Sequence, residues 1–72
     1  MKKEEFTKRE IEILQMISQG YVNRVIAEKL KISNRTVQNH ETHMYRKSGV
    51  HSMVELIVYG LQKGYVKIQK NK

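Results

Sequence analysis

Apolar residues recur at the three- and four-residue spacing of amphipathic helices in four successive segments of the chain. In the first segment, Thr7 and Glu10 have the spacing of a capping box, so we expect a helix that begins at Lys8. Gly20 is placed to end this helix, because glycine adopts the left-handed conformation at little cost. The apolar positions of the helix are Ile11, Ile13, Leu14 and Ile17.

The next two predicted helices are separated by a very tight turn. Asn23 is the expected cap of a short second helix, whose inner face is formed by Ile26, Ala27 and Leu30. Only the three residues "KIS" separate it from a third helix. Their serine, Ser33, is the expected cap of this third helix, which runs to Gly49. Two short helices joined in this way form the outline of a helix-turn-helix, whose second helix can be presented to a DNA groove.

A fourth helix is predicted from Ser52, which has capping-box spacing with Glu55, to about Gly64. We therefore expect an all-α fold, a compact four-helix domain that contains a helix-turn-helix. The expected parts of the chain are an N-terminal tail (1–6), the domain (7–66) and a basic C-terminal tail (67–72).

The third predicted helix, about residues 34–48, has two contrasting sides. Val37, Met44 and Ser48 fall on one side, which we expect to face the core. The other side collects Arg35, Gln38, Asn39, Thr42 and Arg46, with His43 and Tyr45 at its margins. The amides of glutamine and asparagine can match the major-groove edge of adenine, and threonine can contact thymine. Arginine suits phosphate oxygens or a guanine edge.

The distribution of charge strengthens this interpretation. The formal net charge is +7, and residues 1–28 hold five basic and five acidic residues, which cancel. Residues 29–72 hold nine basic residues against two acidic ones, Glu41 and Glu55. Such an excess favours a polyanionic partner, with nucleic acid ahead of an anionic membrane surface. The alternatives are a basic surface that serves only solubility and an ordinary solvated helix face.

Other classes of protein fit the sequence less well. A chain of 72 residues is too short for a deep catalytic cleft, and it has no aspartate to orient a catalytic base, so we expect no enzyme. His40 and His43 are one residue short of the His-Glu-x-x-His spacing, and no cysteine or aspartate completes a site, so we expect no metal, cofactor or small-molecule ligand. No apolar run approaches the roughly 20 residues of a membrane span, which predicts a cytoplasmic protein.

Five segments, "TKREIEIL", "QGYVNRVIAEKL", "ISNRTVQNH", "RKSGV" and "ELIVYGL", resemble the LuxR/GerE-type helix-turn-helix domain of bacterial transcription regulators. They cover roughly residues 6–66. The resemblance implies a bacterial, nucleoid-associated regulator that places its third helix in the major groove and pairs through its fourth. Because the chain begins at Met1 and carries no receiver domain, it resembles the short stand-alone members, and the alternative is an excised C-terminal domain with an added methionine.

The resemblance also implies individual DNA contacts. The base-contacting positions are Gln38, Asn39 and Thr42. The backbone-contacting positions that it implies are Asn23, Arg24, Thr36, His40 and Lys47, and the chemistry of arginine adds Arg35 and Arg46. Gln38 stands where the family usually has lysine, which shifts the expected readout toward adenine. Ser48 replaces a core leucine, so packing there should be weaker by about 1 to 3 kcal/mol if the side chain is buried.

The fourth predicted helix carries more apolar residues than one small core requires. Val54, Val58 and Leu61 form the predicted dimer interface, and Gly60 would permit close approach of two helices. A two-fold dimer would bind two inverted half-sites of double-stranded DNA about one helical turn apart. The alternative is that the two surface valines have no partner.

The sequence thus predicts a sequence-specific, homodimeric DNA-binding transcriptional regulator, with RNA polymerase as a further candidate partner. The alternative is a DNA-binding-like interaction module that heterodimerises with a related regulator and sequesters it. Gln38 and the acidic Glu41 favour this alternative, whereas the basic charge after residue 28 opposes it.

Overall fold

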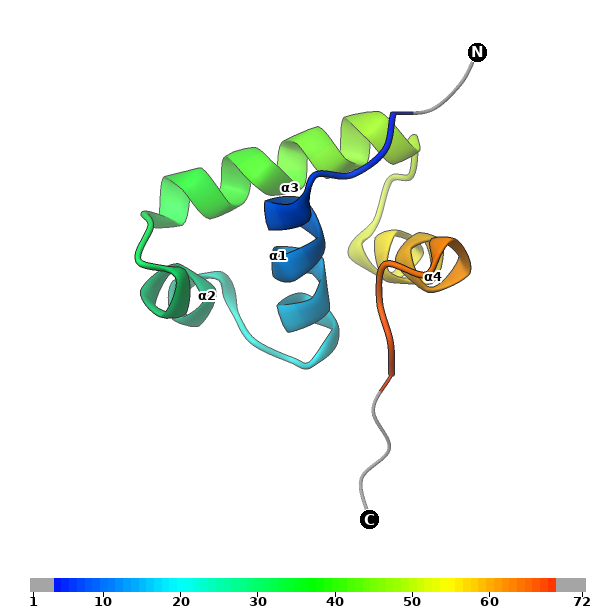
Figure 1. The fold of residues 1–72 in the computed structure, drawn as a ribbon. Coiled ribbons are helices and arrows are strands. Elements are labelled where there is room, and N and C mark those ends of the chain that lie inside the picture. The colour runs from blue at the N-terminus through cyan, green and yellow to red at the C-terminus, as the bar shows by residue number, and fades with distance from the viewer. Residues whose placement is uncertain (1–3, 69–72) are drawn as a thin grey trace.

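The computed structural model describes residues 4–68, which form four helices and contain no strand. The helices are α1 (Lys8–Ser18), α2 (Asn23–Leu30), α3 (Asn34–Ser48) and α4 (Met53–Lys63). The longest helix, α3, lies across α1, while α2 and α4 lie on either side of α1 (Figure 1). The predicted all-α, four-helix fold is confirmed.

The starts of α1 and α3 are fixed by local side-chain caps. The Thr7 hydroxyl accepts a hydrogen bond from the Glu10 amide at 3.1 Å, and the Thr7 amide donates to the Glu10 carboxylate at 2.8 Å. These two bonds complete the predicted capping box, and α1 begins at Lys8 as expected. The Ser33 hydroxyl likewise accepts from the Thr36 amide at 3.0 Å, so the predicted cap of α3 is confirmed.

The other two helix starts differ from the prediction. The cap position of α2 is Val22, which offers no side-chain hydrogen bond, and Asn23 is the first helical residue. The prediction that Asn23 caps α2 is therefore wrong. At α4, Ser52 accepts from the Glu55 amide at 3.2 Å as expected, but the Glu55 carboxylate accepts from the amide of His51 at 2.9 Å and not from that of Ser52.

Three of the helices, α2, α3 and α4, end at a cap residue in the left-handed backbone conformation. Gly49 and Gly64 end α3 and α4 with φ values of 77° and 83°, as their positions in the sequence predicted. The helix α2 ends differently, because Lys31 takes the left-handed conformation with φ 59°. Among residues 4–68 it is the one non-glycine residue with a positive φ, and its Cβ makes this conformation costly.

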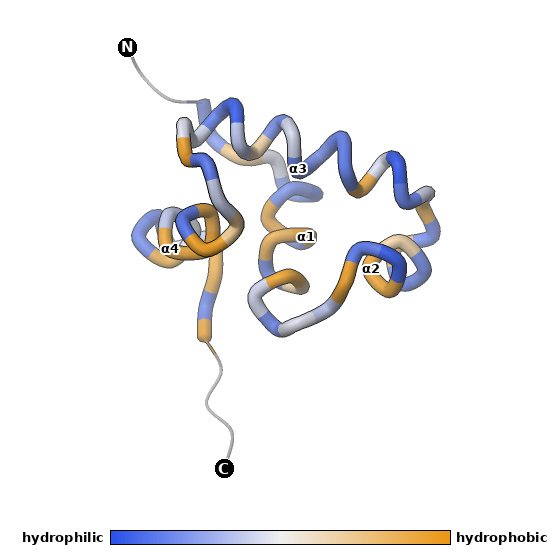
Figure 2. Tube along the Cα trace, turned by 180° about the vertical axis from the view of Figure 1, so that it is seen from behind, coloured by the Kyte–Doolittle hydropathy of each residue, from blue (hydrophilic) through white to orange (hydrophobic). Residues whose placement is uncertain are grey.

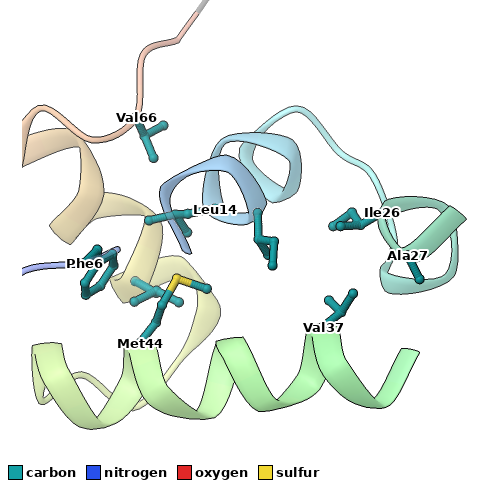
Figure 3. Packing of buried hydrophobic residues seen from close by; sticks show 9 residues of the cluster. Phe6, Leu14, Ile26, Ala27, Val37, Met44 and Val66 are labelled. Atoms are coloured by element: carbon teal, nitrogen blue, oxygen red, sulfur yellow. The ribbon is translucent and has the colours of Figure 1, made fainter. Parts of the chain in front are cut away.

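The core lies between the four helices, and α3 contributes to it from one side only. Most of the length of α3 is hydrophilic, whereas α1 and α4 carry more hydrophobic residues (Figure 2). In Figure 3, Val37 points from α3 toward Ile26 and Ala27 of α2, and Met44 points toward Leu14 of α1. The buried hydrophobic residues are Phe6, Ile13, Leu14, Ile26, Ala27, Val37, Met44, Leu56 and Val66.

Residues before α1 and after α4 in the sequence also pack onto this core. Phe6 is buried and stacks on Tyr65 with 5.0 Å between the ring centroids. The Gln15 side-chain amide donates to the Lys67 carbonyl at 3.0 Å and accepts from the Lys67 amide at 3.1 Å. Phe6 and Lys67 therefore take part in the packing that surrounds the four helices.

Gly60 allows α4 to approach α1 closely. A Cβ atom at this position would lie 2.7 Å from Leu14 Cδ2 and 2.8 Å from Val66 Cγ2. Gly60 itself is buried. The close approach that Gly60 permits is therefore between α4 and other parts of the same domain.

Candidate nucleic-acid interface

The outer face of α3 presents the three predicted base-contacting residues together. Val37, Met44 and Ser48 are buried, which confirms the side of α3 predicted to face the core. Gln38, Asn39 and Thr42 are exposed and fall within about one turn of the helix. Their amide and hydroxyl groups form a surface that can both donate and accept hydrogen bonds.

Exposed basic side chains accompany this face. Arg35 and Arg46 are exposed, and neither takes part in an ion pair within residues 4–68. Arg24, at the start of α2, lies 3.8 Å from Glu28 with 72% of its side chain exposed. An ion pair so long and so exposed is weak, so the Arg24 guanidinium is open to another anion.

Two of the predicted backbone-contacting residues have partners within the domain. The Thr36 hydroxyl lies 2.9 Å from the Ser33 hydroxyl and belongs to the cap of α3. Lys47 Nζ donates to Glu10 Oε1 at 2.9 Å and to the Glu5 carbonyl at 3.3 Å. Only 11% of the Lys47 side chain and 3% of the Glu10 side chain are exposed. This geometry favours a structural role for Lys47 over the predicted phosphate contact.

The Glu10 carboxylate is held in its charged form by these contacts. Burial raises its pKa, but the hydrogen bonds from Lys47 and from the Thr7 amide, together with the charges of Lys47 and His40, outweigh burial and lower the pKa below 4.5. His40 is half-buried near this pair. It therefore lies between the inner network of charges and the outer face of α3.

A second carboxylate, Glu41, lies where α3 meets the start of α2. Asn23 Nδ2 donates to Glu41 Oε1 at 3.3 Å. Glu41 Oε2 is buried and has no hydrogen-bond partner among residues 4–68. Burial raises the pKa of Glu41 despite the hydrogen bond from Asn23, and burial together with the charge of Glu41 raises the pKa of Tyr45. The 100° rotation per residue already predicts from the sequence that Glu41 borders the core-facing side of α3 formed by Val37 and Met44.

Two further properties of residues 4–68 bear on other functions. No three histidine, cysteine, aspartate or glutamate side chains among residues 4–68 are grouped so that they could hold a metal ion. None of the helices α1–α4 is both long enough and apolar enough to cross a membrane.

A short helix, a tight turn and a longer helix with an exposed, amide-rich face together define a helix-turn-helix of the nucleic-acid-binding class. The model of the luxR family of bacterial regulatory proteins matches residues 4–60, and the chain belongs to this family of DNA-binding transcription regulators. The resemblance to the LuxR/GerE type is thereby confirmed.

Individual relatives agree with this family. The oxygen regulatory protein NreC of Staphylococcus aureus (strain JH9) is 51% identical over 57 residues, which are 79% of this chain and 26% of that protein. The chain thus spans about a quarter of the length of the curated relatives it matches.

Two solved structures share the fold. The structure of the transcription factor GerE matches with a TM-score of 0.82 and 36% identity, over 85% of this chain and 91% of that chain. The response regulator ChrA of a heme-sensing two-component system matches with a TM-score of 0.81 and 40% identity, over 90% of this chain and 32% of that chain.

Proposed function

We propose that this domain is a sequence-specific DNA-binding regulator of the bacterial cytoplasm that inserts α3 into the major groove. The observation that carries the proposal is the exposure of Gln38, Asn39 and Thr42 on one face of α3. The major groove is about 12 Å wide and admits an α-helix. Glutamine and asparagine suit the N6 and N7 edge of adenine, so the preferred half-site contains A·T pairs.

The exposed arginines supply the contacts that position the helix. Arg35 and Arg46 lie near the two ends of α3, and Arg24 lies at the start of α2. Contacts from these side chains to phosphates would fix the orientation of α3 without reading sequence. Asn23, Thr36 and His40 are less exposed than the arginines and complete the proposed backbone-contacting set.

A homodimer is the second part of the proposal. Val54, Val58 and Leu61 are 72%, 44% and 40% exposed and follow one another at helical spacing on α4. Exposed apolar side chains gathered on one helix mark a surface for a partner. A two-fold dimer through this surface would bind two inverted half-sites.

The base-reading role is tested by Asn39→Ala. Selection of bound duplexes from a random pool first supplies the preferred site. We expect Asn39→Ala to lose about 1 to 3 kcal/mol of binding free energy on that site and little on random duplex, because it removes a contact to a base edge. Equal affinity of the variant and the wild type for the selected site would overturn the role of Asn39. Gel-shift titrations at one fixed salt concentration measure both.

Arg46→Ala is the matched control on the same helix. This substitution removes a proposed phosphate contact, so the affinity of the variant should fall by a similar factor on the selected site and on random duplex. The slope of log affinity against log salt should also become shallower by about one.

A sequestering module is the second candidate function, and the exposed apolar residues of α4 favour it. Such a protein would use Val54, Val58 and Leu61 to pair with a related regulator and would bind DNA weakly. Salt-dependent binding of the wild type to random duplex supports the DNA-binding function. Its absence, together with pairing to another regulator of the family, supports sequestration.

A further inference from the structure

Glu41 is a carboxylate whose charge is poorly compensated within the domain. It lies on the inner side of α3, where the buried residues Val37 and Met44 precede and follow it by one turn. Its one side-chain hydrogen bond within residues 4–68 comes from Asn23, and Oε2 is buried without a partner. Because Oε2 is buried, no hydrogen bond within the described residues compensates its share of the negative charge.

The residues beside Glu41 are those that a DNA phosphate would use. Asn23 and Arg24 open α2, and both belong to the proposed backbone-contacting set. The Asn23 amide already donates to Glu41. The cap position of α2, Val22, supplies no side-chain acceptor, so the first amides of α2 are not capped by their own chain segment. A phosphate that approached Asn23 would therefore meet the negative charge of Glu41.

We propose that Glu41 restrains DNA binding by this domain. It holds the Asn23 side chain and keeps a negative charge behind the start of α2, so the phosphate backbone must bind against electrostatic repulsion. The inference rests on the proposed DNA-binding function and deepens it: Glu41 is a positioning residue that sets how tightly the domain holds any duplex. Removal of its charge then strengthens binding on all sequences, because the effect concerns phosphates and not base edges.

A purely structural role for Glu41 predicts the opposite result. If the carboxylate only joined α2 to α3, its replacement would loosen the helix-turn-helix and weaken binding or leave it unchanged. A gain in affinity in a variant that remains folded is therefore specific to the proposed restraint. Glu41→Gln retains the shape of the side chain and an oxygen that can accept from Asn23.

The experiment measures the affinity of Glu41→Gln for a selected duplex and for a random duplex at one salt concentration and pH. We expect Glu41→Gln to bind both duplexes about fivefold more tightly than the wild type does. The reason is that salt screens the repulsion between Glu41 and a nearby phosphate only weakly at short distance. Glu12→Gln is the matched control, because Glu12 is an exposed glutamate on α1 whose removal changes the net charge equally. Its affinity should stay within about twofold of wild type.

Three results distinguish the possible failures. A wild-type protein that binds neither duplex overturns the DNA-binding function itself. Detectable wild-type binding with a gain for Glu41→Gln no larger than that for Glu12→Gln overturns the restraint alone. If Glu41→Gln unfolds at a lower temperature than the wild type, Glu41→Val replaces it, and a folded Glu41→Val protein without a gain in affinity also overturns the restraint.

The part played by Asn23 is tested by a double-mutant cycle. In an Asn23→Ala background the gain from Glu41→Gln should be smaller than in the wild type, because without the Asn23 amide a phosphate is no longer held beside position 41. An undiminished gain would contradict a repulsion that acts on a phosphate at Asn23.

Discussion

At the scale of single residues, a largely buried ion pair between Lys47 and Glu10 joins α3 to α1. Lys47 Nζ lies 2.9 Å from Glu10 Oε1, and the side chains are 11% and 3% exposed. Removal of one partner of such a pair leaves the other buried without compensation, which is more costly than loss of the attraction alone. The same pair anchors the N-terminal segment through the bond from Lys47 to the Glu5 carbonyl.

We therefore expect Lys47→Met to lower the free energy of unfolding by about 3 kcal/mol, since methionine fills a similar volume but leaves the Glu10 charge unpaired. Urea denaturation at pH 7 measures the change. Arg46→Met is the control, because Arg46 is exposed, and its effect should stay within about 0.5 kcal/mol. An equally small effect for Lys47→Met would mean that the pair contributes little to the fold.

The stability of the domain should depend on pH through two glutamates with opposite signs. The pKa of Glu10 is lowered in the folded protein, so its contribution is present above the ordinary value of 4.5 and is lost as the pH falls through the folded pKa. The pKa of Glu41 is raised, so its contribution is present below 4.5 and is lost as the pH rises through the folded pKa.

We expect Glu10→Gln to flatten the loss of stability on acidification below pH 4.5. We expect Glu41→Gln to remove a gain in stability that the wild type shows as the pH falls through the folded pKa of Glu41 toward 4.5. Chemical denaturation of the two variants and the wild type across the acid range provides the measurement. Parallel pH profiles for all three proteins would show that neither carboxylate differs between the folded and unfolded states.

The sequence alone could identify the outer face of α3 but not the inner partners of its charged residues. Gln38, Asn39 and Thr42 follow from the 100° rotation per residue, which is a local property. Lys47 was predicted to contact phosphate, and its pairing with Glu10 joins residues 37 positions apart. Such a contact depends on how α1 crosses α3, which no local pattern encodes.

At the scale of the helices, caps could be predicted where the cap and its partner are three residues apart. Thr7 with Glu10 and Ser33 with Thr36 are of this kind. The cap predicted at Asn23 failed because its side chain bonds to Glu41, 18 residues away. No signal in the sequence marked the end of α2 either, because Lys31 adopts there the left-handed conformation that glycine usually adopts.

The end of α2 should be improved by Lys31→Gly. Glycine has no Cβ to clash at φ 59°, so we expect the free energy of unfolding to rise by about 0.5 to 1 kcal/mol, net of the greater chain entropy of glycine in the unfolded state. Glu28→Gly, within the same helix and also exposed, should lower it by about 1 kcal/mol. Thermal and urea unfolding measure both, and a loss of stability in Lys31→Gly would contradict the prediction.

At the scale of the whole molecule, the two surfaces with proposed outside partners belong to different helices. The helix α3 lies across α1 and contacts α4, while α2 and α4 lie on either side of α1 (Figure 1). Close packing of α4 on α1 depends on Gly60, which is buried against Leu14 and Val66. The apolar residues of α4 that this packing leaves exposed are therefore free to pair with a second copy while α3 binds DNA.

We expect the double variant Val54→Ser and Val58→Ser to bind one half-site as the wild type does but to lose the additional affinity for two inverted half-sites. Pairing makes the second binding event intramolecular, and its loss should reduce affinity for the full site by about tenfold or more. Sedimentation equilibrium and gel shifts with one-site and two-site duplexes measure the two effects. Both valines are exposed, so thermal unfolding should change little.

Val22→Ser is the control for this experiment, because it replaces a valine that is 59% exposed but lies outside α4. Its sedimentation should match that of the wild type, since exposed apolar area elsewhere on the molecule does not create a two-fold contact. If the double variant retained the full two-site affinity, the half-sites would have to be joined by another surface. Equal loss in Val22→Ser and in the double variant would instead indicate general hydrophobic association, and the α4 dimer would be wrong.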